Sequence, residues 1–146
     1  MYIKKCTSDD CGRLAALNRK LIEDEGRGRT LTTEQLKKRM ASYLAGDYEA
    51  VFFVEGTSVV GYGLIRKNIS PVCLRHFYVC DDSRKKGCGI KAMRALMDYY
   101  GQDSLDVEVM GKSLKGSFAW ERLGFKPESL LMRFTAESLE NAERRL

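Results

Sequence analysis

Three cations and two glycines stand together near the middle of the chain, in the segment Arg84-Lys-Lys-Gly-Cys-Gly89. The residues before the segment are typical of a strand, and those after it are typical of a helix. A glycine-rich turn at such a place exposes backbone N–H groups and the positive end of the helix dipole, and the cationic side chains add to that field. These residues therefore predict a cradle for an anion, with phosphate as the expected ligand.

Two familiar phosphate cradles fit this segment poorly. A mononucleotide P-loop has the pattern G-x-x-x-x-G-K-[ST], and the segment Arg84–Gly89 contains no Gly-Lys-Ser or Gly-Lys-Thr. The triplet Gly111-Lys-Ser113 occurs further along the chain, but Asp106 stands where that pattern needs its first glycine. The run Gly87-Cys-Gly89-Ile-Lys-Ala92 matches the dinucleotide-binding pattern G-x-G-x-x-A on paper. In that fold the first glycine turns directly off the first strand, whereas here the residues from Asp81 to Lys86 intervene and the strand is the fourth of the chain.

The elements that must position this segment can be predicted from hydrophobic periodicity and turn residues. Helices are expected around Leu14–Ile22 and Leu36–Leu44, from Gly89 to Gly101, and around Leu114–Leu123. A capping box is predicted at Thr32 with Gln35, a second helix start at Thr7–Asp10, and a hairpin turn at Gly56-Thr57-Ser58. Strands are expected at Ile3–Cys6, Tyr48–Glu55, Val59–Arg66, Val72–Cys80, Leu105–Met110 and Leu130–Phe134.

This order of elements predicts an α/β (α+β) fold with a mixed sheet. With 146 residues, 44% of them apolar, the chain is long enough for one compact domain, which we expect to span residues 1–146. Ala136, Leu139, Ala142 and Leu146 recur at helical spacing near the end of the chain. Thr135–Leu146 is therefore expected to be a terminal helix that packs on the domain or on a second subunit, as in a homodimer, or else a solvated tail.

Composition excludes several classes of protein. No apolar run approaches the roughly 20 residues that a membrane span needs, so we expect no membrane association and a cytoplasmic location. Five cysteines without a C-x-x-C pair, and a single histidine, His76, support neither a disulfide framework nor a metal site. The net charge of +5 resides partly in clusters at Arg27 with Arg29 and at Lys37–Arg39, which are typical of solvated surface. Aromatic residues are not interleaved with the basic ones, which argues against nucleic-acid binding.

The sequence resembles the GNAT superfamily of acyl-CoA-dependent N-acyltransferases. Arg84-Lys-Lys-Gly87-Cys-Gly89 matches its pyrophosphate-loop signature [QR]-x-x-G-x-[GA], and the order of elements is similar from Tyr2 to about Phe134. Phe118-Ala-Trp120-Glu-Arg-Leu-Gly124-Phe125 resembles a second signature, an aromatic pair followed by Gly-Phe. The resemblance implies a mixed, mostly antiparallel sheet of six to seven strands flanked by about four helices.

The same resemblance implies that acetyl-CoA is the cosubstrate. The N–H groups from Lys86 to Ile90 would hold its pyrophosphate, and the side chains of Arg84 to Lys86 would help to fix the phosphates, although the lysines also fit a solvated turn. The pantetheine arm would lie along the preceding strand, in a gap between it and Leu105–Met110. The implied coenzyme-binding residues are Phe77, Tyr78, Val79, Arg84, Lys85, Lys86, Gly87, Cys88, Gly89, Ile90, Ser113, Phe118 and Trp120.

In this family the amine attacks the thioester directly, so no side-chain nucleophile is required, and backbone amides stabilise the oxyanion. Many relatives have a tyrosine at the position of Trp120, where it protonates the thiolate, and an asparagine at the position of Ser113. The indole of Trp120 cannot act as a general acid, so Trp120 would line the acyl pocket or pack as an aromatic residue of the core. Tyr78 is then the candidate acid, and Glu25, Glu108 and His76 are the candidate bases.

The sequence thus predicts an N-acetyltransferase that acts on a primary amine of a small molecule or peptide in a ternary complex. The alternative is a protein without catalytic activity, an acyl-CoA-binding regulatory module. The absence of the tyrosine at position 120 is consistent with this alternative. A basic nucleic-acid binder is a third hypothesis, and it predicts salt-dependent retention of DNA or RNA.

Overall fold

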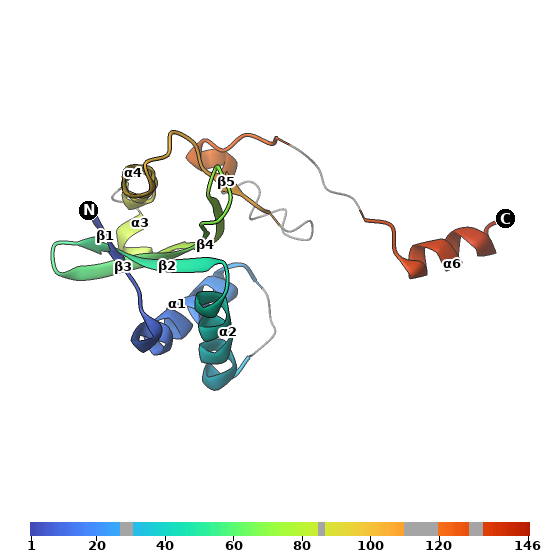
Figure 1. Cartoon of the computed structure of the whole chain (residues 1–146), viewed down its shortest axis with the longest axis horizontal. Coiled ribbons are helices and arrows are strands. Elements are labelled where there is room, and N and C mark those ends of the chain that lie inside the picture. The colour runs from blue at the N-terminus through green and yellow to red at the C-terminus, as the bar shows by residue number, and fades with distance from the viewer. Residues whose placement is uncertain (27–30, 85–86, 110–119, 129–132) are drawn as a thin grey trace.

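A computed structural model of the chain describes residues 1–26, 31–84, 87–109, 120–128 and 133–146 (Figure 1). From residue 2 to residue 107 its main helices and strands follow the order that the sequence predicts. The helical elements are η1 (Ser8–Asp10), α1 (Cys11–Asp24), α2 (Thr33–Ala45), α3 (Asp81–Arg84), α4 (Cys88–Tyr100) and α6 (Ala136–Arg144). The strands are β1 (Tyr2–Lys5), β2 (Tyr48–Glu55), β3 (Ser58–Arg66), β4 (Cys73–Val79) and β5 (Asp106–Val107).

The strands form one mixed sheet in the order β1-β2-β3-β4-β5. The first four are antiparallel to their neighbours, and β5 pairs with β4 in parallel. The predicted class, mixed and mostly antiparallel, is confirmed. In the described part of the chain the sheet has five strands rather than six to seven: the strand expected at Leu105–Met110 is reduced to Asp106–Val107, and Arg133 and Phe134 are not in a strand.

Local capping determines where the first helices begin. Thr32 accepts a hydrogen bond from the backbone N–H of Gln35 at 3.1 Å, and the Thr32 N–H donates to the Gln35 side chain at 2.8 Å, so the predicted capping box is confirmed. Thr7 and Asp10 form a second box, which starts η1 immediately before α1. Two short helical turns, η1 and α3, were not predicted, because hydrophobic periodicity does not register elements of three or four residues.

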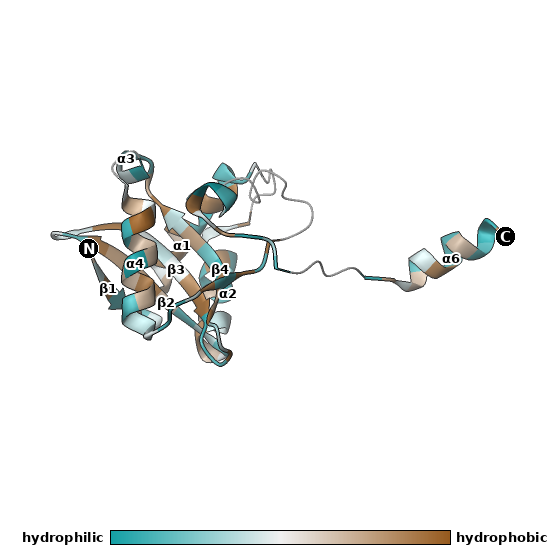
Figure 2. Ribbon diagram, turned by 90° about the horizontal axis from the view of Figure 1, so that it is seen from above, coloured by the Kyte–Doolittle hydropathy of each residue, from teal (hydrophilic) through white to brown (hydrophobic). Residues whose placement is uncertain are grey.

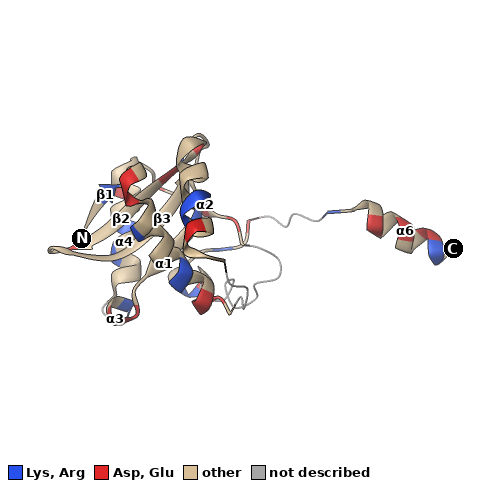
Figure 3. Cartoon of the chain, turned by 90° about the horizontal axis from the view of Figure 1, so that it is seen from below, with Lys and Arg blue, Asp and Glu red and all other residues tan. Residues whose placement is uncertain are grey.

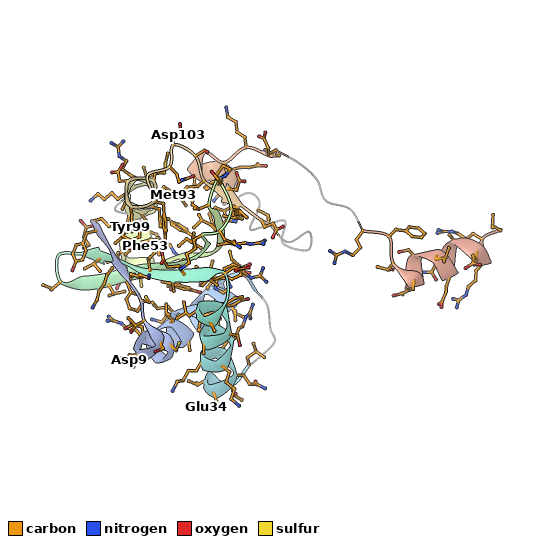
Figure 4. The ribbon with its side chains drawn as sticks, viewed as in Figure 1. Asp9, Glu34, Phe53, Met93, Tyr99 and Asp103 are labelled. Atoms are coloured by element: carbon orange, nitrogen blue, oxygen red, sulfur yellow. The ribbon has the colours of Figure 1, made fainter. Side chains whose placement is uncertain are left out.

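Two hydrophobic cores lie on opposite faces of the sheet (Figures 1 and 2). Helices α1 and α2 cover one face, and their apolar residues pack on side chains such as Phe52, Tyr62 and Tyr78. Helix α4 covers the other face, where Phe53 and Met93 lie between the sheet and the helix (Figure 4). Alternate residues of one strand therefore serve different cores, as the two-residue period of a strand requires.

Strand β4 contains a bulge that matters for the site. His76 pairs with Leu64, but the next residue of β3, Ile65, pairs with Leu74, so Arg75 is the extra residue. A bulge re-aims the side chains around it. As a result Arg75 and His76 both approach Tyr43 of α2, although neighbouring residues of a regular strand would point to opposite faces.

Helix α6 lies apart from the sheet in all views of the chain, and none of its residues is buried (Figure 1). The packing of this segment on the domain or on a second subunit stays a prediction, as does the solvated tail. None of the described helices is long and apolar enough to cross a membrane.

Candidate active site

The predicted anion cradle lies where α4 begins. Gly87 is the N-cap of α4 and has φ +73°, a left-handed conformation that favours glycine. No side chain of the described residues caps this helix start, and because first-turn N–H groups lack intrahelical partners, an anion could accept from them. The cradle residues Lys85 and Lys86, and also Ser113 and Phe118, lie outside the described residues.

The other cradle residues play different parts. Cys88 is buried and faces the core, so only its backbone N–H is available to a ligand, and Ile90 is exposed. A Cβ added at Gly89 would stand 3.3 Å from Leu123 Cδ2, which means that this glycine allows α4 to approach the helical residues Trp120–Leu123 closely. A Cβ added at Gly87 itself would meet no atom of the described residues within 4 Å, apart from its chain neighbours.

Arg84 has a set of contacts that the sequence did not predict. Its Nε donates to the Val79 carbonyl oxygen at 2.7 Å, one Nη forms an ion pair with Asp81 at 2.8 Å, and the other forms an ion pair with Asp24 at the end of α1. The guanidinium also lies over the ring of Tyr78, 5.3 Å from its centroid. All three nitrogens are thus engaged within the protein, and Arg84 ties the turn before α4 to the end of α1.

The edge of β4 next to the cradle is largely unpaired in the described part of the chain. Its pairing with β5 is limited to Cys73 with Asp106 and Leu74 with Val107, whereas β4 continues to Val79. This is the edge along which the family resemblance expects the pantetheine arm. Phe77 points to the α4 face and Tyr78 to the α1/α2 face, while Val79 is buried.

Trp120 belongs to the aromatic core on the α4 face. Its ring centroid lies 5.7 Å from that of Phe77 and 5.1 Å from that of Phe125, and Phe77 in turn contacts Phe53. The half-buried indole therefore packs as a core aromatic, and the contact with Phe77 places it against the strand that the coenzyme would follow.

A buried chain of polar groups lies on the opposite face. Asn18 Nδ2 donates to the Tyr62 hydroxyl at 3.1 Å, and that hydroxyl lies 3.1 Å from His76 Nδ1. Asn18, Tyr62 and His76 are 1%, 0% and 7% exposed, so solvent does not compete for these bonds. Burial raises the pKa of Tyr62 well above its ordinary value, so Tyr62 remains a neutral donor.

The direction of these bonds determines the tautomer of His76. Tyr62 has one proton: when it accepts from Asn18 and donates to His76 Nδ1, the neutral imidazole carries its own proton on Nε2, and when it donates to Asn18 instead, it accepts from Nδ1–H of His76. In the first of these arrangements Asn18 Oδ1 is buried and has no hydrogen-bond partner among the described residues. The reverse orientation of the amide would leave buried N–H donors unpaired, which is the rarer arrangement in proteins.

The four candidate acid and base residues are not all brought together. His76 and Tyr78 lie on the α1/α2 face, and Glu25, at the C-cap of α1, is close enough to raise the pKa of Tyr62 through its charge. Glu108 is exposed and lies beside Cys73 at the start of β4. Burial raises the pKa of Tyr78 above its ordinary value, so Tyr78 remains protonated near neutral pH.

Sequence reasoning missed Asn18, Tyr62 and Tyr43. Asn18 interrupts the apolar stripe of Leu14, Leu17 and Leu21 on the buried face of α1, and that interruption was the available signal. Among the described residues, no group of three or more His, Cys, Asp or Glu side chains could hold a metal ion. Two hollows of about 610 and 320 Å³ lie elsewhere, the first at the end of α4 and the second between α2 and the first two strands.

Comparison with known proteins gives one family and many structural relatives. The family described as "Acetyltransferase (GNAT) domain" matches residues 14–134. No curated protein is similar enough in sequence to count as a match.

Three solved structures illustrate the structural similarity. A possible acetyltransferase from Clostridium difficile 630 superimposes with a TM-score of 0.70 at 17% identity, over 91% of this chain and 95% of that one. An aminoglycoside antibiotic 6'-N-acetyltransferase from Acinetobacter haemolyticus gives 0.65 at 14% identity, over 92% and 97%. An integron cassette protein from the mobile metagenome of Cole Harbour Salt Marsh gives 0.64 at 19% identity, over 92% and 89%. At these identities the similarity shows the fold.

Proposed function

The chain belongs to the GNAT superfamily of acetyltransferases, and from that premise we propose that it transfers the acetyl group of acetyl-CoA to a primary amine. The acceptor is a small molecule or a peptide, and the transfer is direct, within a ternary complex. The coarser assignment, an acetyltransferase of this family, rests on the family match; the amine acceptor and the direct mechanism are the proposal.

The observation that supports coenzyme binding best is the start of α4. Gly87 opens the helix in a left-handed conformation, a Cβ added there would meet no described atom within 4 Å apart from its chain neighbours, and the side chain of Cys88 is buried. A diphosphate needs several converging donors and close approach of the backbone, and this turn offers both. The residues present therefore fit the coenzyme.

In this proposal Arg84 does not bind the phosphates of the coenzyme directly, in contrast to the role that the family resemblance implies. Because its guanidinium is held by Val79, Asp81 and Asp24, it acts first as a positioning residue that shapes the cradle. Binding of the phosphates is then left to the backbone N–H groups and to the side chains of Lys85 and Lys86. Phe77 and Val79 would offer the adjacent strand edge to the pantetheine arm.

Acyl transfer requires two proton movements. The acceptor ammonium must lose a proton before its nitrogen attacks the thioester carbonyl carbon, and the thiolate released when the C–S bond breaks must gain one. We assign the first task to His76 or Glu25, which lie on the same face near Tyr62, and the second to Tyr78 or to solvent. Glu108 remains a candidate base on the other flank of β4.

The buried polar chain suits His76 to this task. To take a proton from the acceptor ammonium, His76 needs its lone pair on Nε2, so Nδ1 carries the proton and donates to the Tyr62 hydroxyl, which must then donate elsewhere. Asn18 offers an acceptor if its amide rotates, because its Oδ1 has no partner in the described part of the chain in the present orientation. The chain of groups can therefore satisfy both the neutral and the charged imidazole.

Two measurements test the proposed function. Calorimetric titration of the protein with coenzyme A should show binding, and acetyl-CoA with a panel of amines should release free thiol for at least one acceptor. Replacing His76 by Gln should lower the rate and remove the corresponding group from the pH profile while leaving coenzyme affinity unchanged. Absence of coenzyme binding by folded protein would refute the proposal.

The second candidate function is a noncatalytic acyl-CoA-binding module. The observation in its favour is Trp120, a core aromatic without acid function at the position where many relatives have a tyrosine. Binding of acetyl-CoA without thiol release for every acceptor tested would support this candidate over the enzyme.

A further inference from the structure

Two arginines from different elements converge on one tyrosine at the α2/β4 surface. Arg39 Nε donates to the Tyr43 hydroxyl at 3.3 Å, and Arg75 Nε donates to the same oxygen at 3.0 Å. Both guanidiniums also lie over the Tyr43 ring, with Cζ 5.8 and 5.5 Å from its centroid. The sequence alone had placed Arg39 in a solvated basic cluster, but in the structure it is half-buried.

The charges of this pair are not neutralised by the described part of the protein. No carboxylate in residues 1–26, 31–84, 87–109, 120–128 or 133–146 lies within ion-pair distance of Arg39 or Arg75, whereas Arg84 pairs with Asp24 and Asp81, and Arg94 with Asp98. Two like charges held close together raise the local potential, and guanidinium groups match carboxylates and phosphates with paired N–H donors. The pair with Tyr43 therefore has the chemistry of an anion site.

This anion site lies next to the proposed catalytic groups. The rings of Tyr43 and His76 meet edge to face with centroids 5.8 Å apart, and the bulge at Arg75 brings Arg75 and His76 to the same side of β4. Acidic residues gather at the end of α1, as Figure 3 shows in red. The Tyr62 hydroxyl lies within electrostatic reach of both Arg39 and Glu25, so positive and negative groups flank it.

We propose that the acceptor amine also carries an anionic group, a carboxylate or a phosphate, which Arg39 and Arg75 bind. This inference rests on the proposed function, and it specifies the class of substrate. The ammonium of such an acceptor would lie toward Glu25 and His76 while its anion lies on the two arginines. An acceptor that carries only positive charges would meet the arginine pair unfavourably.

Matched pairs of amines test the class of acceptor. Thiol release from acetyl-CoA is compared for glycine against glycinamide, β-alanine against its amide, and phosphoethanolamine against ethanolamine, which separates carboxylate from phosphate recognition. We expect the anionic member to have a kcat/KM at least about tenfold higher, since one charge-assisted hydrogen bond contributes that much. Arg75→Gln should abolish the preference, and Arg94→Gln, which changes an exposed arginine of α4, should keep it. Equal rates for acid and amide would overturn the proposal.

A second measurement does not depend on turnover. Burial by itself would raise the pKa of Tyr43, but hydrogen bonds from Arg39 and Arg75 lower it below its ordinary value. Acetate or inorganic phosphate bound to the arginines should offset their charge and shift the ionisation of Tyr43 upward. Ultraviolet titration follows this shift, with Tyr43→Phe identifying the signal and Arg75→Gln and Arg39→Gln as variants that should not respond.

The two measurements distinguish failure of the inference from failure of the proposed function. If the amines release thiol but neither anion affects Tyr43, the anion site is refuted while the acetyltransferase stands. If no amine releases thiol but Tyr43 responds to the anions, the site stands and the proposed transfer reaction is refuted. Circular dichroism of each variant shows whether it is folded, and either arginine variant suffices if the other fails to fold.

Discussion

Replacing Gly87 by alanine should weaken coenzyme binding as well as the fold, and α4 offers a matched control at its other end. Gly87 at the N-cap has φ +73° and Gly101 at the C-cap has φ +61°. A Cβ added at either position would meet nothing within 4 Å. Both substitutions therefore introduce the same left-handed strain without a steric clash.

The expected magnitudes follow from this geometry. An L-residue in the left-handed region costs about 1–2 kcal/mol, so Gly87→Ala and Gly101→Ala should lower the free energy of unfolding by similar amounts. For a chain of this size that corresponds to a fall in Tm of roughly 2–8 °C. If the backbone at Gly87 relaxes to relieve the strain, the first-turn N–H groups turn away from the diphosphate. Loss of one charge-assisted hydrogen bond, about 1.5–3 kcal/mol, weakens binding roughly 10- to 100-fold.

Thermal denaturation and calorimetric titration with coenzyme A measure the two effects separately. Gly87→Ala should show both the loss of stability and the loss of affinity, and Gly101→Ala only the loss of stability. Gly87→Asn should recover part of the stability, because asparagine tolerates the left-handed conformation better than alanine does. Unchanged affinity in Gly87→Ala, or an equal loss of affinity in Gly101→Ala, would show that α4 does not begin at a coenzyme site.

Three further predictions concern other parts of the molecule. Asp24→Asn should lower the free energy of unfolding by less than about 1 kcal/mol, because the ion pair with Arg84 is half-exposed and screened by solvent. Backbone hydrogen exchange in the last turn of α1 should nevertheless accelerate, with the exposed Asp82→Asn as the control. Equal exchange rates in both variants would count against a connection between α1 and the turn before α4 through Arg84. Trp120→Phe should keep most of the activity in the thiol-release assay, since the indole donates no proton, and a loss of several orders of magnitude would contradict its assignment as a core aromatic. Burial alone would raise the pKa of Glu49, but hydrogen bonds from a tyrosine and a lysine lower it, so the unfolded chain binds this proton more tightly. The stabilisation from ionised Glu49 is therefore complete above the ordinary carboxyl pKa of about 4.3 and is lost as pH falls through the lower pKa of the folded state. In urea denaturation, the free energy of unfolding should fall less steeply with acid for Glu49→Gln than for the wild type. Parallel curves for the two proteins would contradict this prediction.

Much of the fold could be predicted because it is encoded locally. The capping box at Thr32, the hairpin turn after Glu55 and the start of α4 at the glycine-rich turn each depend on residues close together in the chain. Such signals act through backbone conformation and nearest-neighbour hydrogen bonds, which a sequence shows directly. The position of the candidate anion cradle followed from the same kind of evidence, together with the family signature that Arg84 begins.

The partners of the site residues could not be predicted in this way. Arg84 meets Asp24 across 60 positions of the chain, and Asn18 meets Tyr62 across 44. These contacts depend on strand register and on how the helices pack, because side chains far apart in sequence are brought together only by the completed sheet. The bulge at Arg75 shows the consequence most clearly, since one extra residue turns Arg75 and His76 to the same side. The sequence by itself determined which main elements form and at which helix start the candidate anion cradle lies, while only the tertiary structure decided which side chains face one another.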